Sequence, residues 1–250
     1  MIKLILLTIV SFHVDTIMIP WGSGKGELGI KTQTREDAGP NMGPLAFDVE
    51  NGRIVFIDTY NSRLEYFDRS GNFLKEIALD KFPNNVILWN GKIYLSTIGW
   101  KGIQFLKLND DKLETITTIK TGKPLVGNSV EFLKDYGNGA LFISYKIIDG
   151  EKIISYFTIF REGIKKEDFI KGDPSIGKNS TVIGYDAKGI PISVWFDDTT
   201  FHFRHGNEIF TWNPVFYAQM HGAPYRIDKD GTLYIVNYPR EGVEVLVVRW

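Results

Sequence analysis

The sequence predicts an all-β fold: a single β-propeller of five four-stranded blades, with six blades as the alternative count. Short runs of β-branched and aromatic residues are separated by glycine-containing turns over most of the chain. The turn glycine between the first two runs of each unit recurs at intervals of 39 to 50 residues, at Gly52, Gly91, Gly139, Gly189 and Gly231. Such an interval, with four strands in each unit, is typical of propeller blades.

The clearest unit spans residues 43–77 and contains four β-rich runs, 45–49, 53–57, 64–67 and 73–77. Glycine in the turns supplies the positive φ that tight hairpins need. Residues 54–57 are apolar without alternation, which indicates a strand buried on both faces between neighbouring blades. We expect the fourth unit to be the least regular, because Pro191 falls inside its second strand.

The last unit contains only three clear strands, at 225–228, 233–237 and 243–249. A sheet that ended there would leave an exposed edge. Residues 15–21 read as a strand, and we expect them to pair with the C-terminal strand and close the ring. The propeller domain is therefore assigned to residues 15–250.

Residues 1–14 allow two interpretations. Lys3 followed by the apolar run 4–10 has the shape of an export signal, which would place the protein in the periplasm or outside the cell. The same residues could instead form an extra strand of the fold, in which case a cytoplasmic location follows. The run is too short for a transmembrane helix, which needs about 20 apolar residues, so no integral membrane domain is expected.

The composition excludes several classes of function. The chain has 250 residues with 29 basic and 30 acidic side chains, and its net charge of −1 lacks the positive field that nucleic acid would select. It contains no cysteine, which excludes disulfides, catalytic thiols and thiolate metal sites. We expect a monomer that binds a small polar molecule or a partner protein, and no nucleic acid.

Residues 22–29 form a glycine-rich segment with a superficial likeness to a phosphate-binding loop. A P-loop requires a first glycine where Ile19 stands and a hydroxyl residue where Gly26 stands. The segment is therefore interpreted as a connecting loop.

The first unit resembles an NHL repeat. It has Gly52, a hydrophobic strand that ends at Asp58, then Asn61 and Arg63, and the segment 22–28 resembles the glycine-rich stretch that commonly precedes such a blade. The likeness is fair in the fifth unit, where Asn237 replaces the aspartate. It is poor in units two to four, where Thr97, Tyr145 and Trp195 stand at that position. The resemblance implies a propeller, usually of six blades. We expect Asp58, Asn61 and Arg63 to hold the strand-to-strand loop.

Polar residues precede the first strand of every unit. They are Asn41, Asn85, Asn128, Asn179 and His221. Because the innermost strands of a propeller surround its axis, these side chains would converge on one mouth of the channel. There they would bind a neutral polar ligand or a divalent cation held by oxygen ligands. The alternative is that asparagine is simply favoured in turns.

Metal and acid–base sites have weaker support in the sequence. His202 and His205 are three residues apart in a predicted strand and should point to opposite faces, so no zinc site is assigned. Asp197 and Asp198 could bind a sugar or act as acid and base, or form a solvated turn.

Two classes of function remain open. The first is a non-catalytic binding or scaffold propeller without a cofactor. The second is a hydrolase or lyase with an axial Ca²⁺ or Mg²⁺, because propellers that resemble the gluconolactonase and streptogramin-lyase groups carry a metal there. Amides dominate the predicted ring, and a neutral ring holds a cation weakly, which favours the first class.

Overall fold

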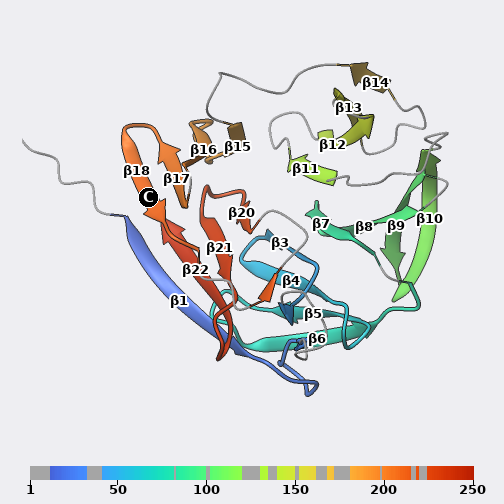
Figure 1. Cartoon of the computed structure of the whole chain (residues 1–250), viewed down its shortest axis with the longest axis horizontal. Helices are drawn as coiled ribbons and strands as arrows, with labels where there is room; N and C mark the ends of the chain where they lie inside the picture. The colour runs from blue at the N-terminus through green and yellow to red at the C-terminus, as the bar shows by residue number, and fades with distance from the viewer. Residues whose placement is uncertain are drawn as a thin grey trace, which may run out of the picture.

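The computed structural model describes residues 12–32, 41–81, 83–99, 102–119, 130–134, 140–149, 152–161, 168–171, 181–197, 199–214, 218–219 and 224–250. All regular secondary structure in these ranges is β-strand. The described strands form five antiparallel sheets of four strands and one sheet of two strands (Figure 1). The expected all-β propeller arrangement is therefore present, and the described residues contain no sixth four-stranded sheet.

Each four-stranded sheet is one blade, named in chain order. Blade 1 contains β3 (Ala46–Glu50), β4 (Arg53–Asp58), β5 (Arg63–Phe67) and β6 (Phe73–Ala78). Blade 2 contains β7 (Asn85–Trp89), β8 (Lys92–Gly99), β9 (Gly102–Asn109) and β10 (Lys112–Ile119). Blade 3 contains β11 (Val130–Lys134), β12 (Ala140–Asp149), β13 (Lys152–Arg161) and β14 (Asp168–Lys171). Blade 4 contains β15 (Thr181–Tyr185), β16 (Pro191–Asp197), β17 (Thr200–His205) and β18 (Glu208–Trp212). Blade 5 contains β20 (Tyr225–Ile227), β21 (Leu233–Asn237), β22 (Gly242–Arg249) and β1 (His13–Pro20).

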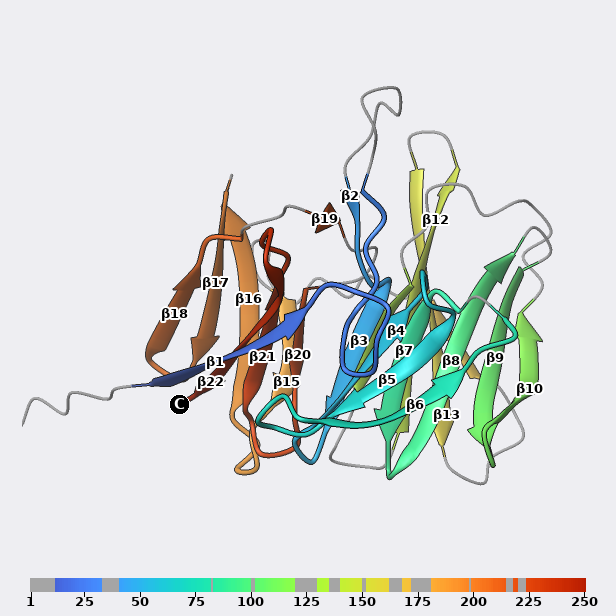
Figure 2. The same cartoon turned by 90° about the horizontal axis from the view of Figure 1, so that it is seen from below.

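The first strand of each blade is the innermost one. These strands touch in a closed cycle, β3 to β7, β7 to β11, β11 to β15, β15 to β20 and β20 back to β3. Seen from the side, the blades stand next to one another with their strands steeply inclined (Figure 2). This cyclic order places the inner strands around one axis, as in a propeller.

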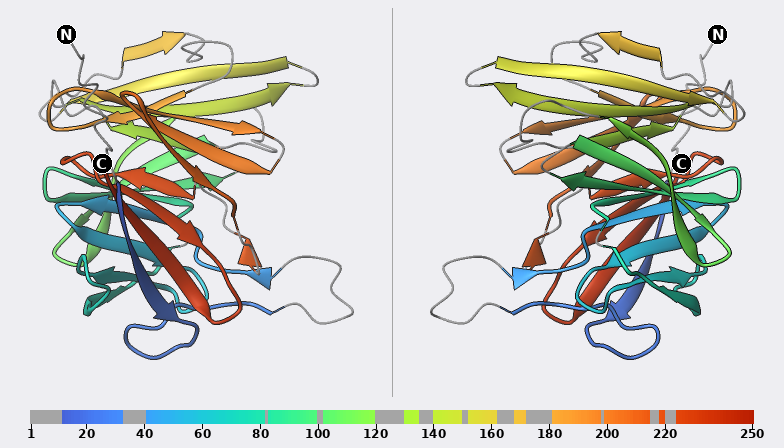
Figure 3. Two further views of the ribbon diagram at one scale, coloured as in Figure 1. Left: turned by 90° about the vertical axis from the view of Figure 1, so that its left-hand side faces the viewer. Right: turned by 90° about the vertical axis from the view of Figure 1, so that its right-hand side faces the viewer.

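The N-terminal strand closes the ring, as predicted. β1 pairs antiparallel with β22 over its whole length, from His13 opposite Arg249 to Pro20 opposite Gly242 (Figure 3). The strand begins two residues before the predicted start at Asp15 and ends one residue before the predicted end at Trp21. β1 thus covers the edge of β22 that would otherwise be exposed.

The hairpin turns follow the glycine pattern of the sequence. Asn51-Gly52 joins β3 to β4 with φ of 54° and 70°, and Asn90-Gly91 joins β7 to β8 with φ of 51° and 73°. Two consecutive positive φ angles are the signature of the type I′ turn, whose twist matches that of the paired strands. Strands of blade 1 consequently begin and end within one residue of their predicted bounds.

The hydrophobic core lies between the blades. One cluster joins blades 5 and 1, a second joins blades 1 and 2, and a third joins blades 4 and 5. In β4, Phe56 belongs to the first cluster while Val55 and Ile57 belong to the second. Both faces of the strand are thus buried, which explains the apolar run without alternation.

Blade 4 accommodates its proline at the strand boundary. Pro191 is the first residue of β16, a position at which the missing N–H is tolerated. The register between β15 and β16 shifts between Val182 and Gly184. The irregularity expected in this blade is therefore a local shift in strand pairing, and blade 4 still forms a four-stranded sheet.

Residues 1–11 lie outside the described part of the chain, as does the interpretation of 1–14 that depends on them. Within the described ranges, no helix has the length and apolar character to cross a bilayer.

Candidate functional site

One end of the ring carries structure outside the blades. β2 (Asn41–Met42) pairs in parallel with β19 (Ala218–Gln219), and Lys31 exchanges backbone hydrogen bonds with Met42 at 2.9 and 3.0 Å. The two short strands lie beyond the end at which β3 begins (Figure 2). This end is called the mouth below, and the short sheet forms part of its rim.

Two of the five predicted mouth residues lie in the described part of the chain. Asn41 begins β2 on the rim and is half-buried, and Asn85 begins β7 and is 4% exposed. Both therefore lie at the predicted end of the ring. Asn128, Asn179 and His221 fall outside the described residues, so the complete ring stays a prediction.

Asn85 lies opposite a buried hydroxyl near the mouth end of blade 2, on the face turned away from blade 1. Ser96 of β8 is the direct cross-strand partner of Asn85, so the two side chains lie on one face of blade 2. The side chain of Ser96 is fully buried, and its Oγ has no hydrogen-bond partner in the described structure. Leaving a buried hydroxyl unpaired costs about 1 to 3 kcal/mol, so this position favours an additional polar group.

A charged pair lies inside the inner strands of blades 5 and 1, at positions for which the sequence analysis made no prediction. Asp48 of β3 accepts the Leu88 N–H of β7 at 2.6 Å. Because β7 is an inner strand and this N–H is not used by β8, Asp48 lies at the axial edge of β7. Arg226 of β20 lies 3.7 Å from Asp48 and stacks over the ring of Phe47 at 5.4 Å. The axial side of the ring thus also carries a charged pair, in addition to the predicted amides, whose ring stays a prediction.

The sequence reading missed this pair, although a signal was present. Asp48 and Arg226 are charged residues inside strands whose neighbours are apolar on both sides. In a strand buried on both faces, such residues require partners.

Carboxylates of one blade cap the turn of the next. Glu50 accepts the N–H groups of Asn90 and Gly91 at 2.7 and 2.8 Å, and Asp228 accepts those of Asn51 and Gly52 at 2.8 and 2.6 Å. Both carboxylates are buried at the end opposite the mouth. Because they accept hydrogen bonds from backbone N–H groups of the next blade, these carboxylates hold neighbouring blades together.

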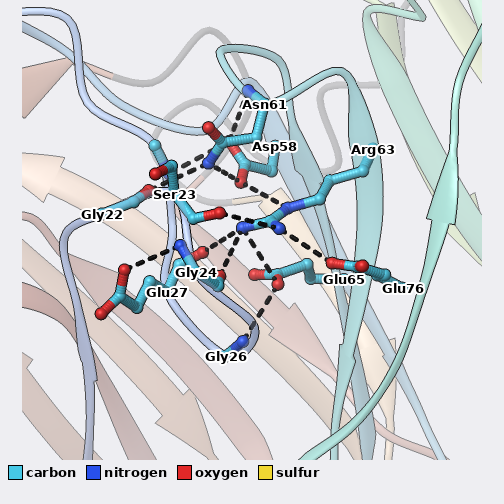
Figure 4. A network of polar contacts seen from close by, with 11 residues as sticks. Gly22, Ser23, Gly24, Gly26, Glu27, Asp58, Asn61, Arg63, Glu65 and Glu76 are labelled. Carbon is cyan, nitrogen blue, oxygen red and sulfur yellow. Dashed lines mark hydrogen bonds and ion pairs between the residues drawn. The ribbon is translucent and has the colours of Figure 1, made fainter.

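The NHL-like residues of blade 1 hold the glycine-rich segment (Figure 4). Asp58 accepts hydrogen bonds from Asn61 Nδ2 at 2.7 Å and from Arg63 Nε at 3.2 Å, and also from the Gly29 N–H at 3.1 Å. The Arg63 guanidinium donates to the carbonyls of Ser23, Gly24 and Glu27 at 3.3, 2.8 and 2.7 Å. The expected structural role is thus extended, because the motif fixes the loop 22–29 as well as its own turn.

Most backbone N–H groups of this loop donate to protein acceptors. Gly22 donates to Leu28, Gly24 to the Glu27 carboxylate and Gly26 to the Glu65 carboxylate. A Cβ at Gly29 would lie 2.7 Å from Asp58 Oδ1, so only glycine fits this close approach. The loop is a connection held against blade 1, as the sequence analysis predicted.

Glu65 is a buried acid within the clamp. Its Oε1 accepts the Gly26 N–H at 3.2 Å and lies 3.2 Å from Arg63 Nη2, and its Oε2 has no hydrogen-bond partner in the described structure. Burial raises the pKa of Glu65 to about 7, against the opposing attraction of Arg63. Asp58 and Glu76 share the same guanidinium and raise the pKa of Glu65 further.

The two histidines of blade 4 contact different carboxylates. His202 Nε2 lies 2.6 Å from Asp197 and its ring stacks on Trp195 at 4.9 Å, whereas His205 Nε2 lies 3.0 Å from Asp186. The two rings do not converge, as the alternation of the strand predicts. Asp198 lies outside the described residues, so the proposed aspartate pair is not tested.

An axial cation would need a set of oxygen or nitrogen ligands at the mouth. Within the described ranges, no group of three or more His, Asp or Glu side chains is arranged to hold a metal ion. The axial carboxylate of Asp48 is occupied by Leu88 N–H and Arg226. Asn128, Asn179 and His221 lie outside the described residues, so the axial cation stays a prediction.

Comparisons with known proteins agree on the fold alone. No protein-family model matches the chain, and no curated protein matches its sequence. The NHL resemblance of blade 1 thus stays a prediction.

Solved structures do match. The chain is similar to a luciferin-regenerating enzyme with a TM-score of 0.52 and 11% identity, over 89% of this chain and 96% of that one. It is similar to a protein of unknown function from Bacteroides thetaiotaomicron with a TM-score of 0.50 and 11% identity, over 96% and 77%. A gluconolactonase from Xanthomonas campestris matches with a TM-score of 0.47 and 10% identity, over 94% and 98%. At these identities the shared property is the fold.

Proposed function

We propose that this protein is a non-catalytic five-bladed propeller that binds a small polar ligand, or a polar segment of a partner protein, at the mouth. The observation that carries the proposal is the unpartnered, fully buried hydroxyl of Ser96 opposite Asn85. A ligand that donates to or accepts from this hydroxyl would satisfy it. The rim formed by β2 and β19 gives the same end a wall in which Asn41 lies.

The chemistry of the mouth favours a ligand with hydroxyl, amide or carbonyl groups. Asn85 can both donate and accept, and so can a serine hydroxyl. The axial charges nearby compensate one another, since Asp48 lies beside Arg226. A neutral, hydrogen-bonding compound such as a monosaccharide or an aldonolactone fits these groups better than a strongly charged one.

The test is a thermal-shift screen of monosaccharides, aldonolactones and neutral amino acids. A ligand at 100 times its Kd stabilises the folded state by about 2.7 kcal/mol, which raises the Tm of a chain of this size by roughly 5 to 10 °C. The variant is Ser96→Ala, with Ser193→Ala as control, since Ser193 lies on the second strand of blade 4. Removal of an unsatisfied hydroxyl should raise the Tm of the free protein and reduce the ligand-induced shift.

Two results would overturn the proposal. One is a screen in which Ser96→Ala and Ser193→Ala respond to every stabilising compound as the unmodified protein does. The other is a Tm that rises with Ca²⁺ or Mg²⁺ and falls with EDTA, together with conversion of a lactone followed by NMR. That second result would support the metal-dependent hydrolase.

A further inference from the structure

Two described hairpin turns at the end opposite the mouth contain the dipeptide Asn-Gly. Asn51-Gly52 joins β3 to β4 and Asn90-Gly91 joins β7 to β8, and both asparagines are exposed. Asparagine is most prone to deamidation when glycine follows it, because glycine has no side chain to hinder a close approach of its backbone. The two turns are therefore chemically vulnerable positions of the propeller.

Deamidation needs the backbone nitrogen of the glycine. This nitrogen gives up its proton and attacks Cγ of the asparagine side chain, so that a new C–N bond closes a cyclic imide. The bond from Cγ to the side-chain nitrogen breaks, and ammonia leaves with the proton. Water then opens the imide at either carbonyl and yields aspartate or isoaspartate. Any contact that keeps the proton on the glycine nitrogen, or keeps this nitrogen away from Cγ, slows the first step.

In both turns a carboxylate of the neighbouring blade holds this nitrogen. The Gly52 N–H donates to Asp228 Oδ2 at 2.6 Å, and the Gly91 N–H donates to Glu50 Oε2 at 2.8 Å. Asp228 and Glu50 are 2% and 5% exposed. A buried anion at this distance stabilises the protonated N–H and opposes negative charge on the nitrogen. The same hydrogen bond directs the nitrogen towards the carboxylate in a turn whose two φ angles are both positive.

The corresponding turns of blades 4 and 5 have neither an asparagine nor, in the described structure, a carboxylate of a neighbouring blade at the glycine nitrogen. Their glycines, Gly189 and Gly231, follow a lysine and an aspartate. The Gly189 N–H donates to the backbone carbonyl of Asp186 at 2.9 Å, and the Gly231 N–H donates to that of Asp228 at 3.0 Å. Among the described first hairpins of the blades, a carboxylate from the neighbouring blade thus holds the glycine nitrogen only where asparagine precedes it.

We propose that Asn51 and Asn90 are deamidation sites, and that the carboxylates of Asp228 and Glu50 protect them as long as the blades are in contact. Loss of either contact opens that turn to the reaction. The product places a new negative charge beside the carboxylate that capped the turn, and the repulsion weakens the contact between the two blades. Isoaspartate also inserts the side-chain methylene into the backbone, which disrupts a two-residue turn.

The experiment follows deamidation of the full chain in mildly alkaline buffer by peptide mass spectrometry, with the two sites scored separately. The variants are Asp228→Ala and Glu50→Ala, and each is the control of the other, since each carboxylate caps a different turn. The same chains in urea give the rates of the unprotected sites. A variant that is merely less stable exposes both sites together, so the ratio of the two rates separates loss of a cap from loss of the fold.

We expect both sites of the folded, unmodified chain to react far more slowly than in urea. Asp228→Ala should accelerate the reaction of Asn51 roughly tenfold and leave Asn90 unchanged, since a hydrogen bond to a charged group is worth at least about this factor. Glu50→Ala should accelerate Asn90 and leave Asn51 unchanged. Equal acceleration of both sites by one substitution, or acceleration of neither, would overturn the proposal. So would a folded, unmodified chain that reacts as fast as the chain in urea.

Discussion

Replacement of Glu65 by glutamine should stabilise the protein above neutral pH and have little effect in mild acid. Glutamine keeps the shape of Glu65 and an oxygen for the Gly26 N–H, but it carries no charge. The pKa of Glu65 rises from 4.5 in the unfolded chain to about 7 in the fold, so folding favours the neutral form. Between these values the folded state holds the additional proton, and its stability falls as the pH rises through 7.

The size of the effect follows from the pKa difference. One pKa unit corresponds to about 1.4 kcal/mol, so the ionised carboxylate costs the fold up to about 3 kcal/mol above pH 8. Relaxation of the loop 22–29 will reduce this figure. For a chain of this length, 1 kcal/mol shifts Tm by about 2 to 4 °C, and we expect Glu65→Gln to raise Tm by roughly 3 to 10 °C at pH 8.5.

The assay is thermal unfolding at several pH values between about 5 and 8.5, followed by circular dichroism. The control is Glu76→Gln, which removes the more exposed partner of Arg63 at 2.8 Å. If the difference in Tm between Glu65→Gln and the unmodified protein is the same at both ends of the pH range, the reasoning is refuted. A destabilised Glu65→Gln at high pH would refute it as well.

Three further predictions concern the ring. Arg63→Ala should lower the free energy of unfolding by about 3 kcal/mol or more in a urea titration, because it leaves buried carboxylates without their cation, and a loss below 1 kcal/mol would contradict the clamp. Deletion of residues 13–20 should abolish cooperative melting or lower Tm by more than about 10 °C, since it exposes the edge of β22; an unchanged melt would disprove closure by β1. Asp228→Ala should lower the free energy of unfolding by about 1 to 3 kcal/mol, because it removes the cap on the turn of blade 1. Asp80 is exposed, and Asp80→Ala should leave the free energy of unfolding unchanged. Equal losses in the two variants would contradict the capping role of Asp228.

The repeat could be predicted from the sequence because its turns and strands depend on local signals, and its closure followed from the repeat. Gly52 and Gly91 mark turns that need positive φ, and the continuous apolar run 54–57 marks a strand between two blades. The strand 15–21 was recognised because the last unit lacked one strand. The turns and strands were inferred from residues within a few positions of one another, and the closure followed from counting the strands of the last unit.

Contacts between blades could not be predicted in the same way. Glu50 caps a turn 40 residues away, and Asp228 caps one on the far side of the sequence. Nothing local distinguishes these carboxylates from solvated turn residues, because their partners are backbone N–H groups that any sequence provides. The axial pair of Asp48 and Arg226 depends on the same ring closure.

For the candidate site, the sequence analysis predicted a set of positions, of which the structure describes two. Counting back from the turn glycines selected Asn41 and Asn85, which lie at one end of the ring, while their part in binding stays a prediction. Ser96 was missed, because a serine inside a strand gives no sign that its hydroxyl will lack a partner. Its importance arises from the register that sets it opposite Asn85.

Hydrogen–deuterium exchange in the presence of a compound that raises Tm tests binding at the mouth most directly. We predict slower exchange in residues 41–42, 85–86 and 95–97, with no change in β1 or β18. Protection confined to the outer strands, or to the opposite end around Asn51 and Asn90, would contradict a ligand site at the mouth.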